Sequence, residues 1–286
     1  MVVWQVDFYR PPLKDESGKK LWELSICDSD RSFELSILCP QSQANSSWIT
    51  EQLRQVNQEK KLPDLMQVFR PQSLSLIEAA GKSLGIKVEA TRRTIALKQL
   101  LEERAKQYPK LANYTGEAYN PVVLESPPPL PLPENLWGDR WRFAALPAGD
   151  IEDAFKSRPV PILEMPELLL PLKLGLASTV SVPGVIIDGG RQSMRLAQWL
   201  QEAKPCALNY IPGSPDGLIL EAGLVDRWVV ATFEDSDVKA AGDVYQKRKE
   251  LSHGLHFLLV QPDDSGMTYT GFWLLQSDYL INEKNI

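Results

Sequence analysis

The sequence predicts a mixed α/β (α+β) protein of two domains, and three observations support this prediction. The chain has 286 residues, whereas a single domain usually takes about 100–200. Its composition, 43% hydrophobic and 24% charged residues, is typical of a folded globular chain and excludes a wholly disordered or fibrous one. Strand-like and helix-like patterns alternate in both halves. We therefore expect an N-terminal domain at 1–120, a proline-rich linker at 121–135 and a C-terminal domain at 136–286.

The N-terminal domain is predicted to open with three strands, at 3–9, 20–27 and 32–39. The polar segments DESGK and DSDRS between them are typical of turns, and such short connections indicate an antiparallel meander. The order helix–strand–helix–strand–helix follows, at 45–59, 65–70, 71–84, 86–90 and 94–107. Pro71 fits the first turn of the second helix and Gly85 its end.

The linker contains the run PPPLPLP, which favours extended polyproline geometry and lacks amide donors. Such a segment cannot join a helix or a central strand. We expect a semi-rigid spacer, and a PxxP ligand for an SH3-like partner is the alternative.

The C-terminal domain is also predicted to be mixed α/β. A strand at 141–146 is followed by one or two short helices over 151–174. The remaining predicted elements are a strand at 184–187, a helix ending near 203, strands at 206–211, 217–221 and 227–233, a helix at 236–251, and closing strands at 256–261 and 268–275.

The motifs of common enzymes are missing from the sequence. It contains no GxxxxGK[ST] or HExxH pattern and no GxSxG elbow between a strand and a helix, since GKSLG at 81–85 lies at the end of a predicted helix. Cys27, Cys39 and Cys206 are too scattered for a disulfide framework or a metal knuckle, and they indicate reduced thiols. The two histidines, His253 and His256, fit a helix end and a packed imidazole better than a metal site or a catalytic triad. We therefore predict no enzymatic activity, no catalytic residue, no metal and no cofactor.

Two other groups of residues leave alternatives open. Asp188-Gly189-Gly190, between a strand and a helix, could present backbone amides to a phosphate, but a turn that requires positive φ explains the glycines as well. Asp7, Glu23 and Glu34 could line one face of the meander.

Three strands followed by a helix and a strand resemble the restriction-endonuclease-like core. That core usually carries a (D/E)xK triplet on its third strand to hold a metal and activate water. Here the triplet is Glu34-Leu35-Ser36 and lacks the lysine. A metal-dependent nuclease, or a degenerate descendant of one, is thus the alternative function, and paired or solvated carboxylates are the other interpretation.

Basic residues are concentrated in one part of the chain. The net charge is −6, yet residues 60–110 hold 11 basic and 5 acidic groups. Local clustering decides the surface potential, because screening limits its range to about 8–10 Å. Guanidinium groups before a helix start are well suited to phosphates. The predicted RNA-binding residues are Arg70, Lys82, Lys87, Arg92, Arg93 and Lys98. Phe69 could stack a base, with core packing as the alternative.

Five strings resemble one protein family. They are CPQSQANS at 39–46, VFRPQSLSLIEAAGKSLGIKVEATRR at 68–93, LPENLWGDRW at 132–141, GLHFLLVQ at 254–261 and GFWLLQ at 271–276. They are similar, in the same order around the proline-rich break, to the chloroplast and cyanobacterial translation activators named Tab-two in green algae and Atab-two in land plants. The last two strings, rich in apolar residues, are expected to be paired core strands.

The resemblance implies a non-catalytic protein that binds single-stranded, A/U-rich 5′ untranslated RNA of photosystem mRNAs and promotes their translation. It implies no particular RNA-contacting residue. Because we find no signal or transit peptide and no membrane span, we expect a cyanobacterial, cytoplasmic member. A photosystem assembly factor that acts through protein contacts is a further alternative.

Overall fold

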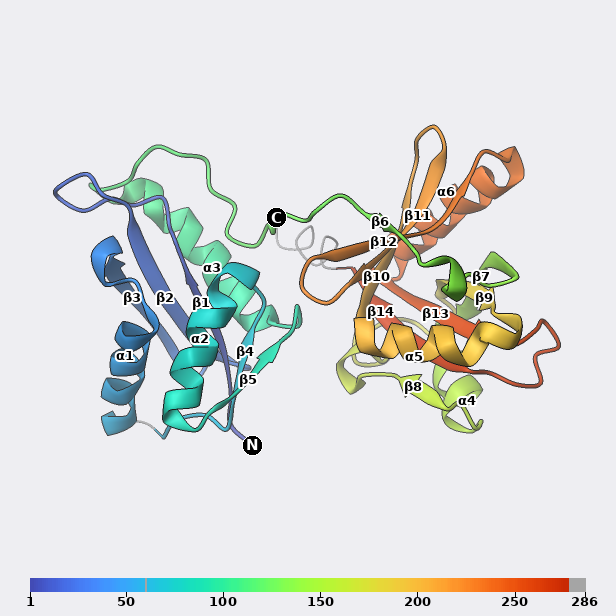
Figure 1. Ribbon diagram of the computed structural model, residues 1–286, viewed down its shortest axis with the longest axis horizontal. Helices are drawn as coiled ribbons and strands as arrows, with labels where there is room; N and C mark the ends of the chain where they lie inside the picture. The colour runs from blue at the N-terminus through green and yellow to red at the C-terminus, as the bar shows by residue number, and fades with distance from the viewer. Residues whose placement is uncertain (60, 278–286) are drawn as a thin grey trace. The chain divides into compact units, whose positions relative to one another are not determined.

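The computed structural model describes residues 1–59 and 61–277 (Figure 1). These residues form two compact units, of which the first is Met1–Glu125 and the second begins at Ser126. Both units combine helices with β-sheets. The prediction of a mixed α/β fold in two parts is therefore confirmed.

The first unit is built on a five-stranded sheet. Its strands are β1 (Val3–Tyr9), β2 (Leu21–Asp28), β3 (Glu34–Pro40), β4 (Leu65–Val68) and β5 (Lys87–Ala90). They lie in the order β3-β2-β1-β4-β5, with β5 at one edge. The first three strands pair antiparallel, as the short turns predict, and β4 and β5 continue the sheet parallel to β1.

Helices cover both faces of this sheet (Figure 1). They are α1 (Ser46–Glu59), α2 (Pro71–Leu84) and α3 (Ile95–Gln107). Because side chains alternate along a strand, Trp4, Val6 and Phe8 of β1 face α1 and α2 in one core, while α3 packs in another around Phe69. The predicted order helix–strand–helix–strand–helix is confirmed. Gly85 ends α2 in the left-handed region, at φ 71°, where a side chain would be strained.

The second unit contains two sheets. The strands of one sheet lie in the order β7 (Arg140–Pro147), β9 (Ser181–Asp188), β13 (Leu255–Gln261), β14 (Gly271–Gln276) and β8 (Ile162–Glu164). The strands of the other sheet lie in the order β10 (Pro205–Ile211), β11 (Asp216–Ala222), β12 (Asp226–Phe233) and β6 (Leu130–Pro131). The helices are α4 (Ile151–Lys156), α5 (Ser193–Ala203) and α6 (Ser236–Leu251).

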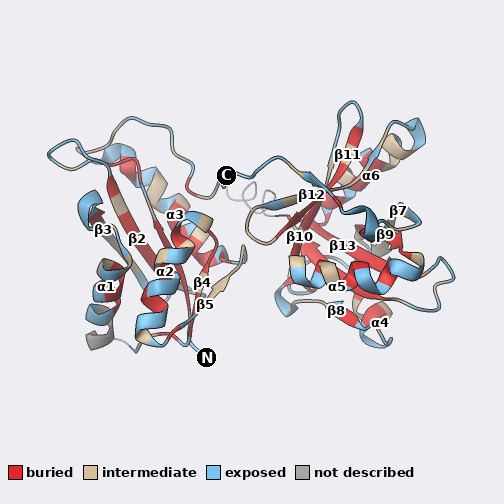
Figure 2. Ribbon diagram, in the orientation of Figure 1, coloured by how far each residue is buried: buried red, intermediate tan, exposed pale blue. Residues whose placement is uncertain are grey.

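The two sheets of the second unit share a core with α5 and α6. Val185 and Trp273 from one sheet, Leu208 from the other, and Leu196 and Tyr245 from the helices are buried together. Figure 2 shows β13 among the buried segments. The strings GLHFLLVQ and GFWLLQ fall on β13 and β14, which pair antiparallel, so the prediction that they form core strands is confirmed.

One strand differs from the prediction for the second unit. Residues 151–174 were expected to hold one or two short helices, and α4 is one of these, but β8 (Ile162–Glu164) is an additional strand at the edge of its sheet. Prolines at 159, 161 and 166 explain the difference, because a helix cannot continue through them.

The predicted linker contributes residues to both units. Leu124 packs against the Phe69 cluster of the first unit, whereas Leu132 is buried in the core of the second. Leu130–Pro131 form β6, which pairs with β12 at the edge of its sheet. An edge position is the one that proline tolerates in a sheet. Within the described part of the chain, no helix has the length and hydropathy needed to cross a membrane.

Candidate nucleic-acid interface

Two of the predicted cations lie where β5 begins. Lys82 is in the last turn of α2 and Lys87 is the first residue of β5. Both side chains are exposed. They flank the turn at Gly85, and among the described residues neither is held in an ion pair. Both ammonium groups are therefore accessible to a ligand.

Three more cations lie where β5 ends. Arg92 and Arg93 connect β5 to α3, and Lys98 is in the first turns of that helix. Arg93 is exposed, and the other two are half-buried. The Lys98 ammonium lies 5.7 Å from the centre of the Phe69 ring. The N-terminal end of a 13-residue helix adds its own positive potential to that of the side chains.

We define the β5 edge surface as the five cations Lys82, Lys87, Arg92, Arg93 and Lys98. They stand in two groups at the two ends of β5, a strand whose four residues span about 13 Å. Glu89 lies between the groups and accepts a hydrogen bond from Gln67 at 3.0 Å. The two groups therefore bracket β5 at the edge of the sheet.

Arg70 does not belong to this surface. Its side chain is 3% exposed, and its Nε donates to the Asp7 carboxylate at 3.0 Å. Its Nη2 donates to the Pro121 carbonyl oxygen, and its guanidinium lies 4.0 Å from the centre of the Tyr9 ring. The guanidinium is enclosed and cannot reach a phosphate, so its role is structural and we remove Arg70 from the candidate interface.

Phe69 is likewise a core residue. Its side chain is fully buried and packs with Cys27, Leu97 and Leu101. It therefore cannot stack on a base, and of the two interpretations of this residue the structure supports core packing.

The three carboxylates of the meander lie on one face, as the strand register shows. Each meets an arginine from outside its own strand, in the ion pairs Asp7–Arg70, Glu23–Arg104 and Glu34–Arg31. Glu23 also accepts a hydrogen bond from the Tyr108 hydroxyl. No group of three or more metal-ligating side chains is found in the described part of the chain. These residues match the interpretation as paired strand carboxylates.

The turn at Gly189 and Gly190 has a structural explanation. The Gly189 amide donates to the Gln261 carbonyl at 2.8 Å, and the Gly190 amide donates to the Pro262 carbonyl at 2.9 Å. Gly190 has a φ of 51°, and a side chain at Gly189 would approach the Ser193 Cα to 2.7 Å. Because both amides are used within the protein, neither is presented to a phosphate.

His256 is the packed imidazole that the sequence predicts. It is fully buried, and its Nε2 accepts a hydrogen bond from the Leu208 amide at 2.8 Å. Burial lowers the pKa of His256 well below its usual value, which keeps the ring neutral. The imidazole serves the packing of the second unit.

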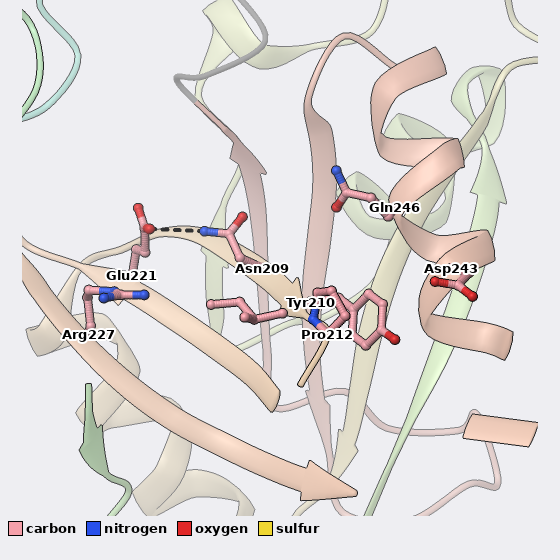
Figure 3. A pocket seen from close by; sticks show the side chains of 8 residues that line it. Asn209, Tyr210, Pro212, Glu221, Arg227, Asp243 and Gln246 are labelled. Atoms are coloured by element: carbon pink, nitrogen blue, oxygen red, sulfur yellow. Dashed lines mark hydrogen bonds between the residues drawn. The ribbon is translucent and has the colours of Figure 1, made fainter. Parts of the chain in front are cut away.

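A polar pocket in the second unit was missed by the sequence analysis. It lies where β10 meets α6 (Figure 3). Beneath it Lys249, 2% exposed, donates to the Leu208 carbonyl and to Asn209 Oδ1. Burial lowers the pKa of Lys249 to about 7. In the sequence this residue stands in the charged run QKRKE, which gives no sign that one lysine turns inward.

The fold and the surfaces described above define a class of protein. The first unit presents cations at both ends of an edge strand, and the carboxylates of its meander are neutralised by arginines. These are properties of a nucleic-acid-binding protein, whose affinity for a strand depends on accessible Lys and Arg groups.

Comparison with known proteins identifies the family. The models for the RNA-binding protein Tab2/Atab2 match residues 3–104 with the N-terminal domain and residues 119–276 with the C-terminal domain. The chain therefore belongs to the Tab2/Atab2 family of RNA-binding proteins, which confirms the resemblance seen in the sequence.

Two curated relatives are named "Protein TAB2 homolog, chloroplastic". The one from Zea mays is 32% identical over 278 residues, which cover 95% of this chain and 70% of the relative. The one from Arabidopsis thaliana is 30% identical over 278 residues, covering 95% and 74%. Among solved structures, a cryo-EM structure of the simian T-cell lymphotropic virus intasome with PP2A regulatory subunit B56 gamma matches at 13% identity over 50% of this chain and 64% of that chain. Its TM-score of 0.24 is too low for a comparison of folds.

Proposed function

We propose that this protein is a non-catalytic activator of translation that binds single-stranded, A/U-rich 5′ untranslated RNA of photosystem mRNAs in the cytoplasm of a cyanobacterium. Membership of the Tab2/Atab2 family of RNA-binding proteins supports RNA as the partner. The observation that carries the choice of site is the β5 edge surface, whose cations lie within the residues matched by the N-terminal family model.

The β5 edge surface would bind the sugar–phosphate chain. Each phosphate that meets a lysine or arginine releases condensed counterions, so affinity falls as salt rises. Five contacts to a single strand correspond to a slope of about −3.5 in log K against log salt concentration, or roughly a hundredfold loss over a fourfold rise in salt. This contribution is independent of base sequence, so base preference must come from other contacts.

Replacing Arg92 and Arg93 together by alanine is expected to weaken RNA binding about tenfold near 0.15 M salt, because two phosphate contacts are lost. For the same reason the salt slope should become shallower by about 1.4. A mobility-shift or filter-binding titration at several salt concentrations measures both quantities.

The matched control replaces two exposed arginines of the second unit, Arg191 and Arg195, and should leave both quantities unchanged. Circular dichroism checks that both double variants are folded. An unaltered affinity in the Arg92→Ala, Arg93→Ala protein would remove the β5 edge surface as the RNA site.

The identity of the bound transcripts can be measured directly. Crosslinking in the native cells, followed by sequencing of the bound RNA, is expected to recover A/U-rich 5′ untranslated regions of photosystem mRNAs. Recovery of photosystem polypeptides that persists after ribonuclease treatment, without enrichment of these transcripts, would instead indicate an assembly factor that acts through protein contacts.

A further inference from the structure

The pocket between β10 and α6 has the size of a small-ligand site. Its volume is about 500 Å³, within the range of roughly 300–1,000 Å³ that is common for ligand pockets. It is lined by Asn209, Tyr210, Ile211, Pro212, Glu221, Arg227, Asp243 and Gln246 (Figure 3). Tyr210, Ile211 and Pro212 thus adjoin several hydrogen-bonding groups, and ligand pockets commonly combine these two kinds of side chain.

Asn209 is held in a fixed orientation within the pocket. Its Nδ2 donates to Glu221 Oε1 at 3.0 Å, the bond drawn in Figure 3. Its Oδ1 accepts from the buried Lys249 ammonium at 2.7 Å. A side-chain amide has two donor hydrogens on its nitrogen and two acceptor lone pairs on its oxygen. After these two bonds, Asn209 Nδ2 keeps one donor hydrogen and Oδ1 keeps one lone pair. The orientation of the remaining donor and acceptor is set by the protein before any ligand binds.

Two further side chains bring hydrogen-bonding groups from other elements. Gln246 of α6 lines the pocket (Figure 3), is half-buried, and uses one of its two amide hydrogens in a bond from Nε2 to Glu250 Oε1 at 3.3 Å. Arg227, also half-buried, comes from β12, and its Nε is a buried donor with no hydrogen-bond partner among the described residues. A second amide and a guanidinium therefore line the same space as Asn209.

The charges around the pocket nearly cancel. Glu221 and Asp243 supply two carboxylates, and Arg227 and Lys249 oppose them. A phosphate would gain little here, because the two acids repel it. A neutral group with donors and acceptors along its edge and flat apolar faces matches the lining better.

We propose that this pocket receives one unstacked base of the bound RNA strand, with adenine as the preferred base. The inference rests on the proposed RNA-binding function and adds to it the site that reads a base. Sequence-specific proteins commonly recognise single-stranded RNA by accepting a splayed base and bonding to its edges. The amide of asparagine or glutamine is complementary to adenine, which offers the N6 amino donor beside the N7 acceptor.

The test compares RNA with and without bases. Gln246→Ala is the first variant, because Asn209→Ala would leave the buried Lys249 without its partner and could unfold the unit. Arg227→Ala is the second. Fluorescence anisotropy would measure binding to labelled oligoadenylate, to oligouridylate and to an abasic ribose–phosphate oligomer of equal length. Gln192→Ala, at an exposed position of the same unit, is the matched control.

Each pocket variant is expected to bind oligoadenylate roughly tenfold more weakly than the unmodified protein, which is the loss typical of one good base contact. Binding to oligouridylate should change less, and binding to the abasic oligomer should not change. The salt slope should also stay the same, because no phosphate contact is lost. Gln192→Ala should match the unmodified protein on all three ligands.

Two results would overturn the inference. The first is that, in both variants, the affinity for oligoadenylate and the affinity for the abasic oligomer change by the same factor or do not change. The other is a pocket that binds free adenosine monophosphate but contributes nothing to oligoadenylate binding, which would make it a site for a free nucleotide. Failure of the proposed function is distinct, because the unmodified protein would then bind none of the three oligomers.

Discussion

Arg70→Ala is expected to lower the free energy of unfolding of the first unit by about 3–5 kcal/mol, the loss typical when one partner of a buried ion pair is removed. Asp7 is 2% exposed, and without the guanidinium its charge would stay buried and unpaired. The contacts of Arg70 to the Pro121 carbonyl and the Tyr9 ring would be lost at the same time. Urea denaturation of the full chain, with hydrogen exchange followed in β1 and β4, measures the change in the correct unit.

Arg93→Ala is the matched control, because both arginines were predicted from the same cluster but Arg93 is exposed. A surface substitution of this kind usually changes stability by about 0.5 kcal/mol or less. The double variant Asp7→Asn, Arg70→Met should be less destabilised than Arg70→Ala, since it leaves no unpaired charge. Equal stability of the Arg70→Ala and Arg93→Ala proteins would contradict a structural role for Arg70.

The second unit is expected to become about 2–3 kcal/mol more stable between pH 7 and pH 9, at 1.36 kcal/mol per pKa unit. Burial lowers the pKa of Lys249 to about 7 from an ordinary value of 10.5. Between these two values the unfolded chain binds a proton that the folded chain does not, so stability rises with pH. Below pH 7 Lys249 is protonated in both the folded and the unfolded chain, so its contribution to the pH dependence ends there. Urea midpoints at pH 7, 8 and 9 measure the rise.

The other titratable groups around Lys249 leave this pH window clear. The pKa of His256 is lowered from 6.5, so this imidazole affects stability only below pH 7. The pKa of Tyr245 is raised from 10, so this hydroxyl affects stability only above pH 9. The two buried thiols belong to the first unit. Because their pKa values are raised from 9.0, they lower the stability of that unit as the pH approaches 9 and rises above it, and they do not affect the second unit. Lys249→Met should flatten the pH dependence. A rise of the same size in that variant would assign the effect to another group.

The sequence was sufficient for the order of elements in the first unit, because local rules decide it. Alternating apolar residues mark the meander, and Pro71 and Gly85 mark the two ends of α2. It could not identify β8, whose three residues are too few for a period to appear.

Long-range partners explain what the sequence analysis of the site missed. Arg70 and Arg93 look alike in a count of charges, yet Arg70 meets Asp7, 63 positions earlier in the chain. Lys249 belongs to a charged run at the end of a helix, and only the fold brings it to Asn209, 40 positions away. Charge clustering therefore locates a basic region, but tertiary structure decides which of its members reach solvent.

The position of Lys87 on an edge strand has a consequence apart from RNA. The outer backbone groups of such a strand can pair with a strand of another molecule and begin aggregation. A charged lysine on β5 opposes that association, because two copies brought edge to edge would place like charges against each other. The same ammonium group would then oppose association of separate copies of the protein through this edge.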